Sequence, residues 1–446
     1  MRRFAAGRVC QRDVCTQEFT LRIPAFSSDG AGFVVPNISR ALEKRIPEAH
    51  LAVARRLGIA CAGLGARAFL VGGSVRDALM GLQSGDLDIT IQSPPRDFAS
   101  TIAAALDGEV LMTSQFSTAR LNVADVEFDL VMARSETYPE PGALPEVAPG
   151  SLSDDLARRD FTVNAMAVEL SPASWGELVD PHGGRADLSG RVIRVLHAAS
   201  FRDDATRLLR AARYASRFGF DLTESSLVQA LDSADYVKSI SPDRFRNELE
   251  RVFDEPRARV ALAMLHEWRV LDAYLPGLEL DPEPWLRFET ARPRNAPERR
   301  AVAFGLLALA AGTPTLAVSL NLGADASRTV RDALSLGREL GAMKPDEMRP
   351  SALVRWLDRF DPLAVTASAM FSADVGIRAK LNEYLDTLRH VRPSLDGNDL
   401  IALGVPEGPM VGRGLEALRD ARLDGQVSSP EQEAALARSF VPPAGV

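Results

Sequence analysis

The sequence has few of the residues that form covalent cross-links or soft metal sites. Its three cysteines, Cys10, Cys15 and Cys61, are too few and too scattered for a disulfide framework or a structural zinc site. Its five histidines do not cluster, so we do not expect a histidine-based metal site. No apolar run approaches the roughly 20 residues that span a bilayer, and no apolar core of a secretory signal follows the basic first residues. We therefore expect a cytoplasmic protein without a membrane partner.

The charge balance excludes a protein that is basic over its whole surface, because the formal net charge is −8. It does not exclude nucleic acid as a partner, since binding depends on a local basic patch rather than on the total charge. The chain of 446 residues is too long for a single core, so we expect several domains.

Two kinds of pattern divide the chain. Residues 1–42 have weak periodicity and predict a poorly ordered extension. Short apolar runs then alternate with helical patterns, and after Asp180-Pro-His-Gly-Gly helical periodicity continues to the end. This favours the α+β class, with a mixed α/β head and an all-helical remainder. In the head we expect helices over 46–65, 75–80 and 97–106 and strands over 69–71, 86–91 and 124–133.

Acidic residues stand inside two of the expected strands. Asp86 and Asp88 are one residue apart, so in a strand both side chains share one face. Two carboxylates that close repel each other unless a cation lies between them, and Mg²⁺ prefers such oxygen ligands. A third carboxylate would complete a two-metal site, and Asp129 is a better candidate than Glu127 in the later strand. The alternative is an ordinary exposed acidic pair in a loop.

A glycine pair precedes these aspartates. Gly72 and Gly73 follow a short apolar strand, and we expect Ser74 to cap a helix that Gly81 ends. Free backbone N–H groups at such a helix start favour phosphate, and Arg76 could reach the same anion. The alternative is a tight turn that only needs a positive φ.

The segment from Asp203 to Phe218 predicts a helix with two unlike faces. Its apolar residues fall on one side and its arginines on the opposite side: Arg207, Arg210, Arg213 and Arg217. Because arginines on one stripe repel one another, a solvated surface helix would more often mix acids among them. The stripe favours contact with an anion.

Five segments together resemble the class II tRNA nucleotidyltransferase and bacterial poly(A) polymerase family. They are Gly72-Gly-Ser-Val-Arg-Asp, Asp86-Leu-Asp, Ala133-Arg-Ser-Glu-Thr-Tyr, Arg158-Arg-Asp-Phe-Thr-Val-Asn-Ala-Met-Ala and Asp203-Asp-Ala-Thr-Arg-Leu-Leu-Arg-Ala-Ala-Arg-Tyr. They occur in the family's order and cover residues 69 to about 250 densely. A segment at 404–412 also looks like the tail of such enzymes.

The resemblance implies four parts: the extension 1–42, a polymerase-β-like nucleotidyltransferase head at 43–190, a base-selecting helical neck at 191–275, and a helical body and tail at 276–446 that bind the tRNA acceptor arm. It implies template-independent addition of CCA to the 3′ end of tRNA. The terminal 3′-hydroxyl would attack the α-phosphate of CTP or ATP, pyrophosphate would leave, and two Mg²⁺ ions would be held by Asp86, Asp88 and Asp129. No obligate protein partner is evident.

The resemblance also assigns nucleotide-binding positions. The glycine turn and Arg76 match the phosphate cradle, and further matches are Arg159, Asp160 and Asn164 for ribose and triphosphate, Asp204 and Arg207 for base selection, and Arg210 and Arg213 further along the helix. An Asp acceptor beside an Arg donor fits C and A, which both offer an exocyclic amine. Two residues depart from the family pattern: Asp203 replaces the usual Glu, and Ala205 stands where Pro is common.

Support for the neck and contacts to tRNA are expected further along. Ser241-Pro resembles a helix cap that braces the base-reading helix, and Arg244 and Glu248 have the spacing of an ion pair. A basic cluster is a candidate for tRNA contact or a solvated surface: Arg292, Arg294, Arg299 and Arg300.

Three other functions remain open. A poly(A) polymerase often has a strongly basic C-terminal extension, whereas residues 426–446 contain one arginine and no lysine. An enzyme that adds only CC or only A fits the same motifs. An RNA-binding protein with an inactive head is the non-enzymatic alternative.

Overall fold

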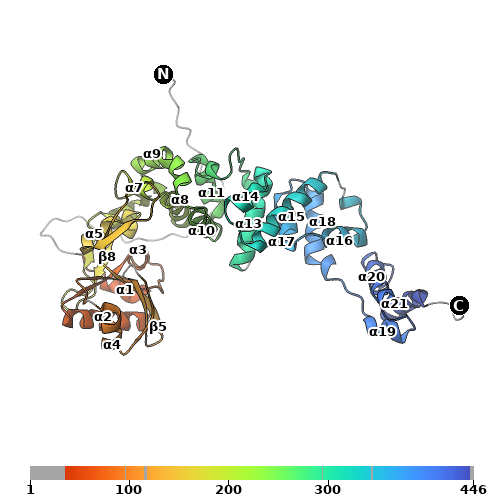
Figure 1. The fold of residues 1–446 in the computed structure, drawn as a ribbon, viewed down its shortest axis with the longest axis horizontal. Coiled ribbons are helices and arrows are strands. Elements are labelled where there is room, and N and C mark those ends of the chain that lie inside the picture. The colour runs from red at the N-terminus through yellow and green to blue at the C-terminus, as the bar shows by residue number, and fades with distance from the viewer. Residues whose placement is uncertain (1–35, 96, 115–117, 294, 343–344, 442–446) are drawn as a thin grey trace, which may run out of the picture. The chain divides into compact units, whose positions relative to one another are not determined.

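The computed structural model describes residues 36–441 except 96, 115–117, 294 and 343–344 (Figure 1). The chain forms two compact units. Unit 1 contains the chain up to Thr137 and then Pro145–Leu196, and unit 2 contains Tyr138–Leu144 and the chain from His197 onward. Of the predicted N-terminal extension, residues 1–35 lie outside the described residues, and its last residues, from Ser39, belong to helix α1.

A mixed sheet is the centre of unit 1, in the order β3-β4-β5-β2-β1-β8-β9. Strands β2 and β5 are parallel, and the neighbouring pairs β3–β4, β4–β5, β2–β1, β1–β8 and β8–β9 are antiparallel. The strands are β1 Arg67–Val71, β2 Asp88–Gln92, β3 Glu109–Thr113, β4 Thr118–Val123, β5 Val126–Met132, β8 Ala167–Glu169 and β9 Leu178–Val179. A separate hairpin pairs β6 Arg134–Thr137 with β7 Glu146–Pro149.

The pattern of β5 shows why these segments form strands. Val126, Phe128 and Leu130 are buried while Glu127 is exposed and Asp129 half-buried, as expected when one face of a strand packs against the core. On β1, Phe69 and Val71 pack in an apolar cluster with Leu156 of helix α5. The expected strand at 124–133 is therefore confirmed, with Ala124 and Asp125 at positive φ in the turn before it.

The helices of unit 1 follow the prediction in part. The expected helices at 46–65, 75–80 and 97–106 are confirmed as α2 Glu48–Gly63, α3 Gly73–Met80 and α4 Phe98–Ala105. The helices that were not expected are α1 Ser39–Arg45, α5 Leu152–Ala157, α6 Gly184–Gly190 and the 3₁₀ turn η1 Thr162–Asn164. The short strand β10 covers Val192–Ile193. Strands β3, β4, β6, β7, β8 and β9 were not expected from the sequence.

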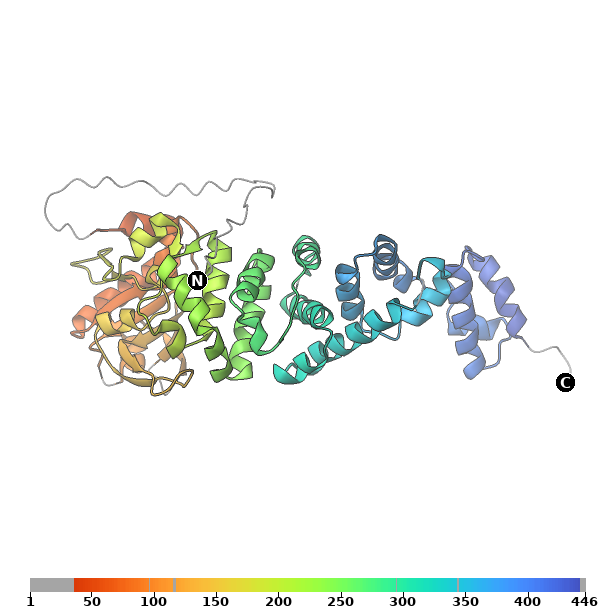
Figure 2. The same cartoon turned by 90° about the horizontal axis from the view of Figure 1, so that it is seen from above.

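Among its described residues, unit 2 has one strand, β11 Asp221–Leu222, and is otherwise helical (Figure 2). Its α-helices are α7 Ser200–Asp203, α8 Thr206–Phe218, α9 Glu224–Ser233, α10 Pro242–Phe253, α11 Ala258–Glu267, α12 Pro282–Thr290, α13 Ala296–Ala311, α14 Thr315–Ser319, α15 Ala324–Leu340, α16 Pro350–Leu357, α17 Pro362–Phe371, α18 Val375–Asp386, α19 Gly397–Ala402, α20 Pro409–Leu423 and α21 Pro430–Ala437. The predicted α+β class is confirmed. None of the described helices combines the length and apolar character that a bilayer crossing requires.

Candidate active site

The glycine turn connects β1 to α3. Gly72 has φ +70°, which strains any other residue, and a Cβ there would lie 2.6 Å from Nη1 of Arg159 and would force that guanidinium to shift. The expected cap was wrong: Gly72 is the residue before the helix, and Ser74 does not cap it. The Ser74 hydroxyl instead donates to the carbonyl of Asp86 at 2.6 Å. This bond ties the glycine turn to the segment that enters β2.

The acidic residues meet at the parallel pair of strands. Asp88 begins β2, and its register partner on β5 is Asp129. Asp86 lies before β2, so the expectation of a strand from residue 86 was wrong by two residues. The Asp88 residue is exposed, but the protein around its carboxylate partly removes it from water, and this desolvation raises its pKa above the ordinary value. Asp129 and Asp86 raise the pKa further, while Arg159 and Arg76 oppose the rise. Asp88 is therefore close enough to both Asp86 and Asp129 to be repelled by each.

A guanidinium faces the third of these aspartates. Arg120 of β4 is the antiparallel register partner of Asp129. Its Nε and Nη2 donate to the two oxygens of that carboxylate at 2.8 and 3.0 Å. Within the part of the chain that the structure describes, no three His, Cys, Asp or Glu side chains are gathered closely enough to hold a metal ion. The three aspartates are neighbours, but their side chains do not converge.

The residues expected to bind triphosphate and ribose form one hydrogen-bonded group. Arg76 is buried and its Nη1 donates to Oδ1 of Asn164 at 2.5 Å. The amide nitrogen of Asn164 then donates to Oδ1 of Asp160 at 2.9 Å. Arg159 lies next to Gly72. The fold therefore brings the motif that begins at Arg158 beside the glycine turn.

Asp155 is a residue of this site that sequence reasoning missed. It is completely buried in α5, and its oxygens accept from Arg158 at 2.7 Å and from Arg159 at 3.0 Å. Thr90 of β2, two residues after Asp88, has its hydroxyl 3.4 Å from the same carboxylate. The sequence signal that could have revealed this residue is its spacing, because Asp155 precedes Arg158 by three residues and Arg159 by four. The effect of Asp155 is to hold Arg159 in place.

The residues expected to select the base lie in unit 2, where α7 passes into α8. Oδ1 of Asp204 accepts from the Thr206 amide, the Thr206 hydroxyl and Nη2 of Arg244 at 3.0, 2.7 and 2.8 Å. Arg207 is buried, and its Nη1 donates to the Ser200 hydroxyl at 2.6 Å. The expected Arg244–Glu248 pair was wrong, because Arg244 reaches across to Asp204 instead.

The helix with two faces is confirmed as α8. Its apolar residues Leu208, Ala211 and Ala212 are fully buried. Arg210 and Arg213 lie 3.7 and 3.8 Å from the carboxylate of Glu248 on α10, which relieves their mutual repulsion. The predicted cap of α10 is also confirmed: the Ser241 hydroxyl accepts from the Arg244 amide, and Pro242 is the first helical residue.

A histidine beside these residues titrates below its usual range. Burial and then Arg207 lower the pKa of His197, and Asp203 opposes this. The distance from His197 Nδ1 to Asp203 Oδ2 is 3.9 Å, so Asp203, which departs from the family pattern, faces an imidazole that is mainly neutral at pH 7.

The predicted basic cluster is an internal ion-pair network. Arg299 and Arg300 donate to the two carboxylate oxygens of Asp254 at 2.7 and 2.6 Å. Arg292 donates to the backbone carbonyl of the same residue. Arg294 lies outside the described residues. The charges of Arg299 and Arg300 are thus balanced inside unit 2 by Asp254 and Glu250.

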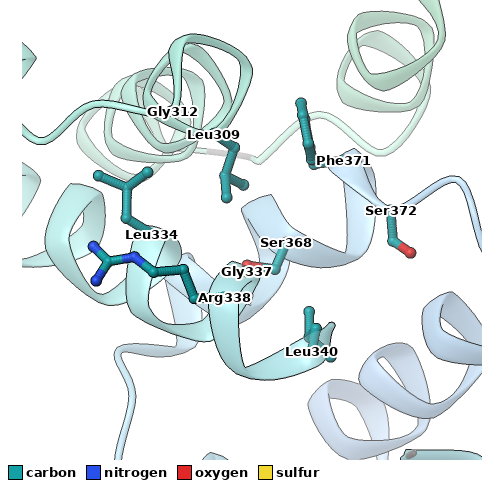
Figure 3. A pocket seen from close by; sticks show the side chains of 9 residues that line it. All are labelled: Leu309, Gly312, Leu334, Gly337, Arg338, Leu340, Ser368, Phe371 and Ser372. Atoms are coloured by element: carbon teal, nitrogen blue, oxygen red, sulfur yellow. The ribbon is translucent and has the colours of Figure 1, made fainter. Parts of the chain in front are cut away.

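A cavity of about 400 Å³ lies among α13, α15 and α17 of unit 2 (Figure 3). Side chains from all three helices line it, among them Leu309, Leu334 and Phe371, with Arg338 at its border. None of the residues predicted to carry chemistry lines this cavity.

The mixed sheet, the glycine turn and the neighbouring aspartates define a nucleotidyltransferase head. Residues 68–194 match the model of the "Poly A polymerase head domain", and residues 219–281 match the "Probable RNA and SrmB- binding site of polymerase A". The chain belongs to the tRNA nucleotidyltransferase and poly(A) polymerase family. This confirms the resemblance inferred from the motifs.

Relatives with three different names are similar to the chain. It is 33% identical to a CC-adding tRNA nucleotidyltransferase of Deinococcus radiodurans over 83% of this chain and 89% of the relative. It is 40% identical to an A-adding tRNA nucleotidyltransferase of Halalkalibacterium halodurans over 53% of this chain. The match covers 57% of the length of this A-adding relative, and 48% of the length of the A-adding tRNA nucleotidyltransferase of Geobacter sulfurreducens. The chain thus spans about half the length of these two relatives. A solved CCA-adding enzyme in an apo form has a TM-score of 0.78 and 25% identity, covering 91% of this chain and 99% of that one.

Proposed function

We propose that this protein adds CCA to the 3′ end of tRNA without a template, transferring CMP and AMP from CTP and ATP with release of pyrophosphate. The observation that carries the proposal is the pairing of Asp88 with Asp129 on parallel strands beside the glycine turn and its arginines. A turn that only binds an anion would not need the neighbouring aspartates, and an acidic pair without such a role would not need arginines beside it. The combination is what a site for metal ions and a triphosphate requires.

The donor set suits divalent ions. All three candidate ligands are carboxylates, and Asp88 has a raised pKa because desolvation and its acidic neighbours disfavour its charge, which a cation would relieve. Asp86, Asp88 and Asp129 would hold two Mg²⁺ ions, which supply charge neutralisation and an activated hydroxyl to phosphoryl transfer.

The remaining residues bind and orient the nucleotide. The N–H groups at the start of α3, together with Arg76 and Arg159, would hold the triphosphate, and Asp160 and Asn164 would contact the ribose. In unit 2, Arg207, Arg210 and Arg213 would donate to the base and the phosphates.

Asp204 is suited to accept from the base. The three donors that bind it all use Oδ1, which leaves Oδ2 for the exocyclic amine of C or A. U and G present a carbonyl at the corresponding position, and two facing acceptors would be left unpaired. This would discriminate against UTP and GTP.

Primer extension with tRNA transcripts that end before CCA, after the first C or after CC tests the proposal. Each is incubated with labelled CTP, ATP, UTP or GTP, with and without Mg²⁺. Stepwise incorporation of C, C and A that needs Mg²⁺ supports it. Asp88→Asn should abolish incorporation, while Glu127→Gln, an exposed acid on the same strand as Asp129, should not.

Partial addition is the second candidate, because relatives are named A-adding and CC-adding. Extension of only the tRNA that ends in CC, by one A, would assign the A-adding activity. Extension that stops after two C residues would assign the CC-adding activity. Long A tails on any RNA would indicate a poly(A) polymerase, and tRNA binding without incorporation would indicate an inactive head.

A further inference from the structure

Three residues on neighbouring strands of unit 1 lie in one row across the sheet. Arg120 of β4 is paired in register with Asp129 of β5, and Asp129 is paired in register with Asp88 of β2. Register partners on adjacent strands point to the same face of a sheet, and adjacent strands lie about 5 Å apart. Asp129 therefore has a cation on one side and a second acid on the other.

The contact between Arg120 and Asp129 uses both oxygens of the carboxylate. The two hydrogen bonds, at 2.8 and 3.0 Å, are the side-on arrangement of a guanidinium and a carboxylate. The Arg120 side chain is 47% exposed and that of Asp129 35% exposed, so solvent weakens the pair and leaves it able to open.

We propose that Arg120 competes with a divalent metal ion for Asp129. The guanidinium neutralises Asp129 while no metal is bound, and it gives up that carboxylate when a metal ion enters between Asp129 and Asp88. The inference rests on the proposed function, because it assumes that these aspartates hold the metal.

Two consequences follow from this competition. A metal ion must displace the arginine and enter beside a positive charge, so Arg120 lowers the affinity of the acidic site for divalent ions. Removal of Arg120 leaves Asp129 beside Asp88 without its paired cation in the metal-free protein. The same substitution should therefore weaken the metal-free fold and strengthen metal binding.

Titration of the full-length, metal-free protein with Mn²⁺, followed by the electron paramagnetic resonance signal of free Mn²⁺, tests the proposal without any turnover. Arg120→Gln is expected to bind Mn²⁺ about fivefold more tightly than the wild type, which corresponds to about 1 kcal/mol, the upper value for a pair this exposed. The melting temperature without metal should fall, and its rise on adding Mn²⁺ should be larger than in the wild type.

Matched variants separate this effect from a general loss of charge. Arg67→Gln breaks another arginine–carboxylate contact between strands of the same sheet, that of Arg67 with Glu169, and should leave the Mn²⁺ affinity unchanged. Arg120→Lys keeps the charge without the two-pronged contact and should lie between the wild type and Arg120→Gln. In the Asp129→Asn background, the effect of Arg120→Gln should disappear.

Each result decides the matter. An unchanged or weaker Mn²⁺ affinity in Arg120→Gln, with normal binding by the wild type, overturns the competition but leaves the proposed metal site intact. Binding of Mn²⁺ that survives Asp88→Asn together with Asp129→Asn, or no binding by the wild type, overturns both. Tighter binding in Arg120→Gln that depends on Asp129 supports the proposal.

Discussion

Substitution of Asp155 by asparagine removes one charge from the most enclosed ion-pair group of unit 1. The carboxylate has no exposed surface, and its partners Arg158 and Arg159 have side chains that are 18% and 19% exposed. Asparagine has almost the same shape, but it presents an amide group where the carboxylate accepted hydrogen bonds. Arg158 keeps a second partner in Glu136, at 3.0 Å. Arg159 loses its only carboxylate partner among the described residues.

The expected loss of stability follows from this geometry. Removal of one partner from a buried ion pair costs about 3–5 kcal/mol, and because both arginines keep some contact with water we expect about 2–4 kcal/mol. Urea unfolding of Asp155→Asn and of Asp154→Asn, followed for unit 1 by hydrogen exchange, measures the difference. Asp154 is exposed and forms the capping box of α5 with Ser151, so its substitution should cost much less than that of Asp155.

The loss should depend on pH in a defined direction. Burial raises the pKa of Asp155, but Arg159 and Arg158 outweigh it, and the pKa lies below its ordinary value. A carboxyl group whose pKa is lower in the folded than in the unfolded state stabilises the protein fully when the pH is above the unfolded-state pKa of about 4. This stabilisation is lost as the pH falls through the folded-state pKa. The gap between wild type and Asp155→Asn should be full at pH 7 and shrink below about pH 4. A constant gap down to pH 2, or equal stability of the two variants, would refute the reasoning.

Three further predictions concern single positions. Gly72→Ala should cost about 1–2 kcal/mol of stability because of its positive φ, and should raise the nucleotide KM in extension assays because its Cβ would displace Arg159. Arg244→Ala should lower the preference for CTP over UTP, in kcat/KM, by roughly tenfold, because Asp204 loses a charged hydrogen bond of about 1.5–3 kcal/mol. Cys61, whose pKa burial raises to about 12, should resist alkylation at pH 8 in a variant whose other two cysteines are serine.

Controls are available for each of the three. Gly63→Ala should leave KM unchanged, because a Cβ at Gly63 meets no atom within 4 Å; equal effects at the two glycines would contradict the steric argument. Lys238→Ala breaks an exposed pair with Asp235 and should not alter base preference, so a matching change there would point to general damage. Alkylation of Cys61 as fast in the native as in the urea-unfolded protein would be inconsistent with its burial.

The neighbouring positions of the aspartates could be predicted from the sequence because strand patterns are local. The alternation of Val126, Phe128 and Leu130 with polar residues defines the inward face of β5, and so places Asp129 on the other face. The start of β2 was misplaced because the backbone carbonyl of Asp86 accepts a hydrogen bond from Ser74. Nothing in the strand pattern reveals that tertiary contact.

The partners of charged residues could not be predicted in the same way. The stripe of arginines on α8 predicted an anion-binding face because few acids stand near it in sequence. The acids that balance this stripe lie instead in α10 and just after it. Glu248 lies beside Arg213, and Glu255 accepts a hydrogen bond from Arg217 at 2.8 Å. The register of Arg120 against Asp129 likewise depends on the hairpin of β4 and β5.

Strand β3, at one edge of the sheet, was not predicted from the sequence for a related reason. In β3, Leu111 and Met112 are both exposed, so the segment does not alternate between apolar and polar residues as a half-buried strand does. Its pairing with β4 is also irregular between Val110 and Met112. An edge strand packs against only one neighbour, and its sequence is correspondingly less constrained.

The ion pairs within the predicted basic cluster limit where unit 2 can attract a polyanion. Because Asp254 and Glu250 together already balance Arg299 and Arg300, a phosphate that approached them would compete with existing carboxylates and gain little. Among the described residues, the exposed arginines of α15 make no ion pair; they are Arg328, Arg331 and Arg338. Charge attraction is worth most where it is not already satisfied within the protein. We therefore expect a polyanion that approaches unit 2 to be attracted by such unpaired arginines more than by the densest run of arginine in the sequence.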